Sequence, residues 1–162
     1  MIGNRNPLRD RLFISLPYLL LLLLAVPFSR PLFAPLPWLG RLLRPWIALT
    51  AGWVGSLWVF VVLLLLYRFV VHNRKIQHAI RYNVAQVVFA GIALLIAKLV
   101  LRLGLTLLGA GVRVLGAIAD VMSVIVFLGA VAIAIYCIAE NWRGRYPRVP
   151  TLSSAARIVT SG

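Results

Sequence analysis

The sequence contains few acidic residues, although acids supply many of the groups that catalytic and metal sites require. There are three among the 162 residues, Asp10, Asp120 and Glu140, and they stand far apart in the chain. General acid–base catalysis needs positioned titratable groups, and pairs of carboxylates are a common solution. No such pair is indicated, so the sequence argues against an enzyme of that type.

Cysteine and histidine are equally scarce. Cys137 is the single cysteine, so no disulfide can form within the chain, and we interpret it as a small buried hydrophobic residue. His72 and His78 are six residues apart, whereas a helical metal pair has i, i+4 spacing with a carboxylate nearby. Glycine-rich phosphate loops and serine nucleophile motifs are also missing. The sequence therefore predicts no catalytic residues, no cofactor and no metal site.

Hydrophobic residues, by contrast, are abundant and arranged in long runs. They make up 62% of the chain, and charged residues make up 12%, against roughly 45–50% and about 25% in ordinary soluble domains. A helix needs ~20 mainly apolar residues to cross a bilayer. We therefore predict an all-α, polytopic membrane protein with four transmembrane helices at Leu12–Phe28, Trp46–Tyr67, Tyr82–Leu101 and Val121–Ala139.

The predicted spans form one transmembrane domain at residues 12–139. A polar N-terminal segment, residues 1–11, precedes it, and a basic C-terminal tail, residues 140–162, follows it. The first apolar run has no small-residue cleavage site after it, so we interpret it as a span and not as a signal peptide. Pro17 lies inside this run and predicts a kink, or a helix that begins near the proline.

Prolines concentrate between the first two predicted spans, in residues 29–45. Trp38 begins a stretch in which apolar residues alternate with Arg41 and Arg44. This pattern is typical of a short interfacial helix, with Trp38 and Trp46 at the level of the lipid headgroups. An irregular loop held by the same tryptophans is the alternative, and the sequence alone leaves both open.

The chain is strongly basic, with 17 lysines and arginines and a formal net charge of +14. Such a charge in a soluble protein would suggest nucleic-acid binding. Here the basic residues lie mainly between apolar runs, and no aromatic and basic platform lies outside them to hold a strand. We therefore expect no nucleic-acid partner. We expect contacts with lipid headgroups or partner subunits, and the candidate residues are Arg74, Lys75, Arg81, Arg143 and Arg145.

The distribution of the basic residues also predicts the orientation. An even number of spans places both termini and residues 68–81 on one side of the membrane. That side holds eleven basic residues and the other side holds six. Cytoplasmic segments are the ones enriched in lysine and arginine, so we expect both termini and residues 68–81 to face the cytoplasm or stroma.

Two amides stand out within the third predicted span. Asn83 and Gln86 are three residues apart and therefore lie on one face of a helix. Polar side chains in hydrocarbon usually face the bundle interior or a water-filled cavity. One interpretation is that this face lines a polypeptide path or contacts another subunit. The alternative is an interhelical hydrogen bond that holds the bundle together, which would contribute ~1 kcal/mol.

Five stretches of the sequence resemble a known family. Residues 70–86 read VVHNRKIQHAIRYNVAQ, and residues 143–156 read RGRYPRVPTLSSAA. The shorter stretches are DRLF at residues 10–13 with LPYLL at 16–20, and LPWL at 36–39. They occur in the same order as in the twenty-kilodalton subunit of the translocon at the inner chloroplast envelope and its cyanobacterial relatives, the Tic-twenty family.

The resemblance implies a membrane subunit of a protein-import translocon that contributes to a polypeptide channel. It implies other membrane subunits, a translocating polypeptide and further copies of the chain as partners. The strong preference for arginine over lysine favours a cyanobacterial relative, in the plasma or thylakoid membrane. The plastid inner envelope is the other localisation that the resemblance implies.

One departure from the family concerns Gly91, because many members carry an acidic residue in that part of the third span. Any role that needs a carboxylate there is therefore not expected for this chain.

Physical chemistry alone also allows a second function, because a small basic bundle without catalytic groups equally suits a structural or assembly subunit. Such a subunit would belong to a larger membrane complex, for example a photosynthetic one.

Overall fold

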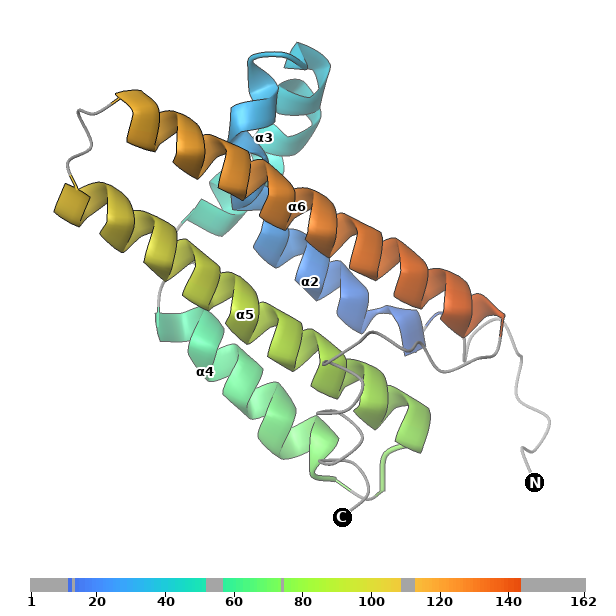
Figure 1. The fold of residues 1–162 in the computed structure, drawn as a ribbon. Helices are drawn as coiled ribbons and strands as arrows, with labels where there is room; N and C mark the ends of the chain where they lie inside the picture. The colour runs from blue at the N-terminus through green and yellow to red at the C-terminus, as the bar shows by residue number, and fades with distance from the viewer. Residues whose placement is uncertain (1–11, 13, 52–56, 74, 109–112, 144–162) are drawn as a thin grey trace.

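The computed structural model describes residues 12, 14–51, 57–73, 75–108 and 113–143. Within these residues the secondary structure is helical and contains no strand, as the sequence predicts. The helices form an elongated bundle, and one further helix stands off from it (Figure 1).

The two longest helices are α5, His78–Leu108, and α6, Arg113–Trp142. Both are long and apolar enough to cross a membrane. At about 1.5 Å per residue each extends ~45 Å, which exceeds the ~30 Å of a hydrocarbon core. They contain the third and fourth predicted spans, and they extend both of them into the glycine-rich connection. They lie side by side and run in opposite directions (Figure 1).

The first apolar run forms two consecutive helical segments. The α-helix α2, Pro17–Ala25, continues directly into a 3-10 helix, η1, Val26–Phe33. The helix α2 begins at Pro17, because proline lacks an N–H that the first turn of a helix would leave unbonded anyway. Pro31 lies inside η1, where the missing N–H disfavours continued α-helical bonding. The helical run therefore ends at Phe33, five residues after the predicted end of the span.

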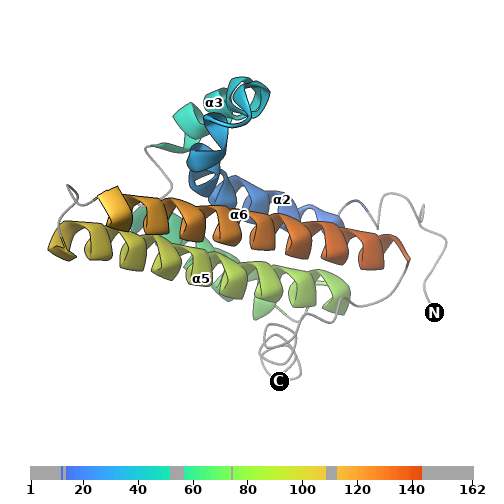
Figure 2. The same cartoon turned by 45° about the horizontal axis from the view of Figure 1, so that its top comes forward.

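The proline-rich connection contains a helix, so the irregular-loop alternative is wrong. This helix, α3, runs from Pro37 to Ala51 and packs mainly against η1. Gly40 is buried there, and a Cβ at this glycine would lie 3.2 Å from the Phe33 ring. Figure 2 shows that α3 projects away from the long helices.

The described residues of the second predicted span belong to more than one helix. Residues from Trp46 to Ala51 belong to α3, and the next helix, α4, is Leu57–Leu66. It continues into a π-helical turn, η2, Tyr67–Val71. Hydropathy alone missed this division, because the residues of the second predicted span are uncharged throughout.

Successive long segments run up and down along the bundle. Tyr18 of α2 contacts Asn83, and Leu24 of the same helix approaches Gly91, so α2 and α5 are parallel. The helices α4 and α6 both run antiparallel to α5. Because Asn83 also contacts Ile14 and Asn141, the first and last described segments meet at one end of the bundle. We call this the terminal end, and we call the opposite end, from which α3 projects, the α3 end.

Side chains fill the interior of the bundle. The core joins α2, α4, α5 and α6, and its largest fully buried apolar members are Tyr18, Leu21, Leu63, Val71, Val87 and Val88. Gly91 of α5 lies close to both α4 and α2, because a Cβ there would be 3.1 Å from the Leu63 methyl carbons and 3.2 Å from Leu24. No space therefore remains beside Gly91 for a carboxylate.

Candidate functional site: a buried polar cluster

Six polar or weakly polar side chains gather inside the terminal end of the bundle. Each of the contributing segments supplies two of them, three or four residues apart, so that each pair lies on one face of its helix. We call this set the polar cluster; its members are Ser15, Tyr18, Asn83, Gln86, Cys137 and Asn141. All six are buried, even though the surrounding helices are strongly apolar.

Tyr18 is at the centre of the polar cluster. Its hydroxyl lies 2.7 Å from Gln86 Oε1 and 3.0 Å from Asn83 Oδ1. A tyrosine hydroxyl has one hydrogen, so it donates to one of these oxygens at a time. The shorter distance favours Gln86, and both distances are normal for strong O–H···O bonds. Tyr18 thus joins α2 to two successive turns of α5.

Asn83 connects three segments of the chain. Its Nδ2 donates to the carbonyl oxygen of Ile14 and to Asn141 Oδ1, both at 3.3 Å. Together with the Tyr18 contact, these bonds link the entry to α2, the first turns of α5 and the last turn of α6. The Cys137 thiol adds a weak contact, with Sγ at 4.0 Å from Gln86 Oε1. Both amides that the sequence singled out therefore face other helices of this chain.

Two groups of the polar cluster have unused hydrogen-bonding capacity. Ser15 Oγ and Asn141 Nδ2 are buried, and among the described residues neither has a hydrogen-bond partner. A buried polar group without a partner costs about 1–3 kcal/mol, so such groups are uncommon in folded proteins. Of these two groups, the Asn141 amide contacts the centre of the cluster, because its Oδ1 accepts from Asn83.

Arg81 makes a second internal connection at the same end. Its Nε donates to the carbonyl oxygen of Val71 at 2.8 Å, which ties the first turn of α5 to the last residue of η2. Arg81 is buried in this position, and the rings of His78 and Tyr82 stack beside it on α5 with their centroids 6.5 Å apart. The terminal end is thus held by polar contacts on both sides of α5.

Comparisons with known proteins identify the family. The family model described as "Chloroplast import apparatus Tic20-like" matches residues 8–156. This chain belongs to the Tic20 family. It is 29% identical over 149 residues to a "Tic20 family protein" of Synechocystis sp., and the match covers 91% of each chain. No solved structure matches.

The expected resemblance to the Tic-twenty family is therefore confirmed. The family comprises translocon-type membrane components and is not known for enzymatic activity. Within this Tic20-family protein, the described residues hold no group of three or more histidine, cysteine or acidic side chains that could bind a metal ion.

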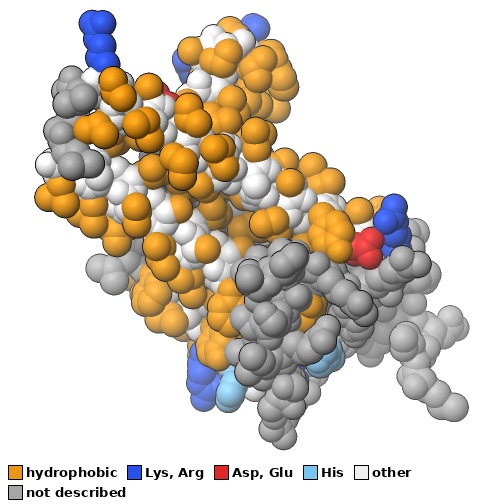
Figure 3. Space-filling view, in the orientation of Figure 1, with side chains coloured by type: hydrophobic (Ala, Val, Ile, Leu, Met, Phe, Trp, Pro, Cys, Tyr) orange, Lys and Arg blue, Asp and Glu red, His pale blue; other side chains and the backbone are white. Residues whose placement is uncertain are grey.

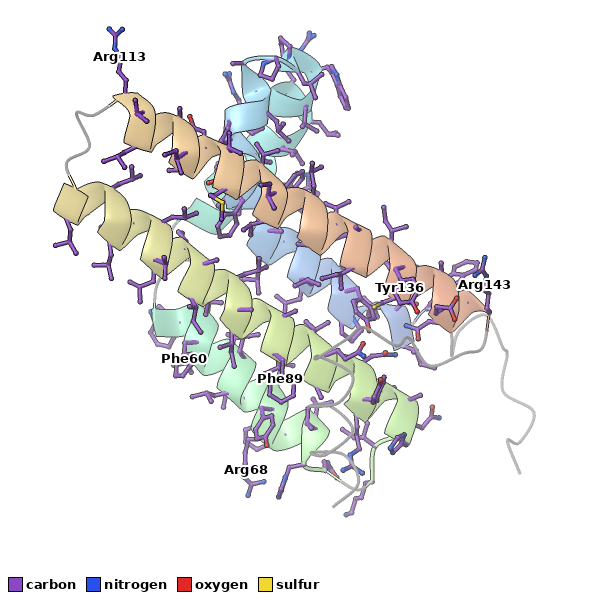
Figure 4. The ribbon with its side chains drawn as sticks, viewed as in Figure 1. Phe60, Arg68, Phe89, Arg113, Tyr136 and Arg143 are labelled. Carbon is purple, nitrogen blue, oxygen red and sulfur yellow. The ribbon has the colours of Figure 1, made fainter. Side chains whose placement is uncertain are left out.

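Two other predicted contact residues of this Tic20-family protein, Lys75 and Arg143, lie at the terminal end. Lys75 is exposed, and its backbone N–H donates to Asn73 Oδ1 at 3.0 Å in the turn before α5. Arg143 is exposed at the end of α6 and pairs with Glu140 at 3.0 Å (Figure 4). Exposed pairs of this kind contribute little to stability. Arg74 and Arg145 lie outside the described residues.

Sequence reasoning missed four members of the polar cluster: Ser15, Tyr18, Cys137 and Asn141. Tyr18 offered one signal, because it is the one aromatic hydroxyl in an otherwise leucine-rich run. Asn141 offered less, because it follows the predicted fourth span and reads as part of a polar tail. Their meeting depends on contacts between residues 58 to 68 positions apart, which no local pattern reveals.

Proposed function

We propose that this Tic20-family protein crosses the bilayer four times, through α2 with η1, α4 with η2, α5 and α6. The up-and-down order of these segments supports this arrangement. Nine α-helical residues at ~1.5 Å each and eight 3-10 residues at ~2.0 Å each make α2 with η1 about 30 Å long, which equals the thickness of the hydrocarbon core. The longer α5 and α6 would tilt, and the shorter α4 with η2 would be accommodated by local thinning of the bilayer.

The surface of the bundle supports the same arrangement. In the view of Figure 3, apolar side chains cover the long helices, and the Lys, Arg and His side chains lie towards their ends. Exposed apolar residues are spread over α4, α5 and α6, where a soluble protein would carry polar side chains. The terminal end, with the larger share of basic residues, faces the cytoplasm or stroma, and α3 lies in the opposite interface.

The orientation can be tested with single-cysteine variants. Cys137 is the one native cysteine, so a Cys137→Ala background carries no competing thiol. Lys75 is exposed in the turn before α5, at the terminal end. Arg113 is exposed at the start of α6, at the other end of that helix from Arg143 (Figure 4). In intact cells or organelles, a membrane-impermeant maleimide is expected to label Arg113→Cys and to leave Lys75→Cys unlabelled. Inverted vesicles should give the reverse pattern, and labelling of both positions from one side would contradict the arrangement.

We further propose that the protein acts as a membrane subunit of a protein-translocation machinery. The family match over residues 8–156 is the observation that carries this proposal. The polar cluster serves to hold α2, α5 and α6 together at the terminal end, because its hydrogen bonds join those three helices.

The packing of the bundle indicates where a polypeptide would pass. Apolar side chains fill the interior, and Gln86 is buried against Tyr18. A chain in transit would therefore run along the outer surface, between this subunit and its partners or further copies. The surface available for such contacts includes exposed apolar residues on three helices; examples are Leu64, Ile96 and Ile135.

Photo-crosslinking from the surface and from the core tests this function. A photoreactive amino acid is placed at Leu64, Ile96 or Ile135, and at the fully buried Val87 as the control. With a precursor arrested during translocation, at least one surface position is expected to form adducts with the precursor, and Val87 is expected to form none. Adduct formation should disappear when the precursor is chased through the membrane.

Purification in a gentle detergent distinguishes a subunit of a translocation machinery from a structural or assembly subunit. Co-purifying translocation components, together with precursor adducts, would agree with the proposal. Adducts to lipid alone, combined with photosynthetic or other energy-converting subunits in a fixed ratio, would overturn it in favour of a structural or assembly subunit.

A further inference from the structure

Helix α3 has three different faces. At ~100° per residue, residues 38–48 fall into three groups whose centres lie roughly 120° apart around the helix axis. The first group, which we call the docked face, consists of one buried and three partly buried residues: Gly40, Leu39, Leu43 and Ile47. The second, the apolar stripe, consists of Trp38, Leu42 and Trp46. The third, the basic face, consists of Arg41, Arg44 and Ala48.

The docked face holds α3 against the bundle. The helix packs mainly on η1, and a Cβ at Gly40 would lie 3.2 Å from the Phe33 ring. With this face against η1, the apolar stripe and the basic face both point away from the segment on which α3 packs. The ribbon views agree with this arrangement, because α3 projects from the bundle in both (Figures 1 and 2).

The apolar stripe is exposed, although it is made of large hydrophobic residues. Trp38, Leu42 and Trp46 recur every four residues, and each is more than half exposed. Tryptophan is enriched where lipid headgroups meet hydrocarbon, because its ring is apolar and its N–H is polar. The stripe therefore suits the upper part of the hydrocarbon layer better than it suits water.

The basic face carries two charges that attract an anionic partner. Arg41 and Arg44 are exposed, and among the described residues neither forms an ion pair. The described acids are Asp120, which is exposed near the start of α6, and Glu140, which pairs with Arg143 at the terminal end. A second copy of these residues would thus offer one unpaired acid to two arginines, whereas an anionic lipid leaflet offers a continuous negative surface.

We propose that α3 binds an anionic lipid leaflet, with the apolar stripe among the upper acyl chains and both arginines on the lipid phosphates. This inference rests on the proposed four-span arrangement, which places α3 at a membrane surface. A helix that lies there beside a bundle meets the bundle on one side, acyl chains below and headgroups above, as the three faces require. The planar guanidinium groups match the phosphate oxygens. Because the docked face joins α3 to η1, the lipid contact also holds η1 at a fixed depth.

Spin labels on two faces test how α3 is seated. In a Cys137→Ala background, a nitroxide is attached at Leu42→Cys in the apolar stripe or at Ala48→Cys on the basic face. The full-length protein is reconstituted into vesicles of phosphatidylcholine and phosphatidylglycerol. Oxygen concentrates in hydrocarbon and a nickel chelate stays in water, so oxygen is expected to relax the label at residue 42 more strongly, and nickel the label at residue 48.

Two results of the spin-label experiment would contradict the proposal. Equal accessibility of the two positions to both agents would show that α3 is not seated with its stripe in the hydrocarbon. Exclusion of both agents from residue 42, or dipolar broadening between labels, would show that a partner protein or a second copy covers the stripe.

Lipid titration tests the basic face. The variant Arg41→Gln with Arg44→Gln is compared with Arg102→Gln and Arg113→Gln, which removes two exposed arginines from α5 and α6. Each full-length, delipidated protein is titrated in neutral detergent with phosphatidylglycerol or phosphatidylcholine, and native mass spectrometry measures the first lipid bound. Phosphatidylglycerol is expected to bind the α3 variant about thirtyfold more weakly than wild type, roughly fivefold for each charge removed. The control should bind it as wild type does.

The remaining outcomes separate this inference from its alternatives. Equal loss in the control variant, equal binding of phosphatidylcholine to wild type, or displacement by inorganic phosphate at constant ionic strength would each overturn it. Loss of an oligomer in both Asp120→Asn and the α3 variant would assign the arginines to a second copy. If the double variant does not fold, Arg44→Gln alone should bind about fivefold more weakly, and unchanged binding would overturn the proposal. The maleimide labelling and the precursor adducts do not involve α3, so failure of the proposed function would be recognised independently.

Discussion

Replacing Asn83 with alanine is expected to loosen the terminal end of the bundle more than any other single truncation in the polar cluster. The variant loses the contacts of Asn83 with the Tyr18 hydroxyl, the Ile14 carbonyl and Asn141 Oδ1. Interhelical hydrogen bonds in membrane proteins contribute on average ~0.6 kcal/mol and at most ~1.7 kcal/mol each. Because the Tyr18 hydroxyl donates to Asn83 only when it does not donate to Gln86, two to three hydrogen bonds are lost, which predicts a loss of about 1–4 kcal/mol.

The single native cysteine gives a direct measurement of this loss. Cys137 is fully buried in α6 and belongs to the polar cluster. A fluorogenic maleimide can react with it only after the helix separates or the protein unfolds. If reaction follows rapid opening and closing, a loss of 2 kcal/mol should raise the labelling rate of Asn83→Ala about thirtyfold.

Gln77→Ala provides the matched control, because it removes an exposed amide just before α5. Its labelling rate should stay close to that of the wild type. Tyr18→Phe should fall between the two, because it keeps the ring and removes only the hydroxyl. Labelling of Asn83→Ala at the wild-type rate, with unchanged melting by circular dichroism, would show that the polar cluster does not hold the helices together.

The second large effect is expected at Gly91. A leucine there must fit where even a Cβ would lie 3.1 Å from Leu63 and 3.2 Å from Leu24. Overpacking of a well-filled core costs typically 1–3 kcal/mol and occasionally more. Gly91→Leu should therefore force α2 or α4 away from α5, lower the melting temperature in detergent and accelerate labelling of Cys137.

Gly129→Leu separates this packing effect from the change in backbone flexibility. Gly129 also lies inside a long helix, but it is exposed and a Cβ there would meet no atom within 4 Å. Both substitutions replace glycine with the same better helix former, a gain of somewhat less than the ~0.8–1.0 kcal/mol that separates glycine from alanine. Gly129→Leu is thus expected to be neutral or slightly stabilising. Equal stability of the two variants would mean that the three helices do not meet closely at Gly91.

Parts of the fold follow directly from local sequence. The apolar runs at residues 82–101 and 121–139 lie within α5 and α6, because a helix satisfies the backbone hydrogen bonds of a long apolar segment within the segment itself. Pro17 begins α2, as its missing N–H predicts. The pattern around Trp38 was equally compatible with a short interfacial helix and with an irregular loop. The structure contains the helix, and Gly40 of this helix lies close to the Phe33 ring.

The candidate site was only half visible in the sequence. Asn83 and Gln86 stood out because two amides on one helix face are unusual inside an apolar run. Tyr18 and Asn141 did not, since their partners are 65, 68 and 58 positions away. Arg81 was grouped with exposed basic residues by charge alone, and the fold places it inside the bundle against Val71. Charge and hydropathy report the average environment of a residue, and they do not report which partner it meets.

The sequence by itself therefore determined the helical class, the two long apolar helices, the family and the scarcity of chemically reactive groups. These properties depend on composition, on local periodicity and on motifs that are contiguous in the chain. The tertiary structure alone decided that α3 takes the start of the second apolar run, that Gly91 sits between Leu24 and Leu63, and that the polar cluster forms. Each of these outcomes depends on how distant helices pack, and packing is set by the shapes of side chains on several helices at once.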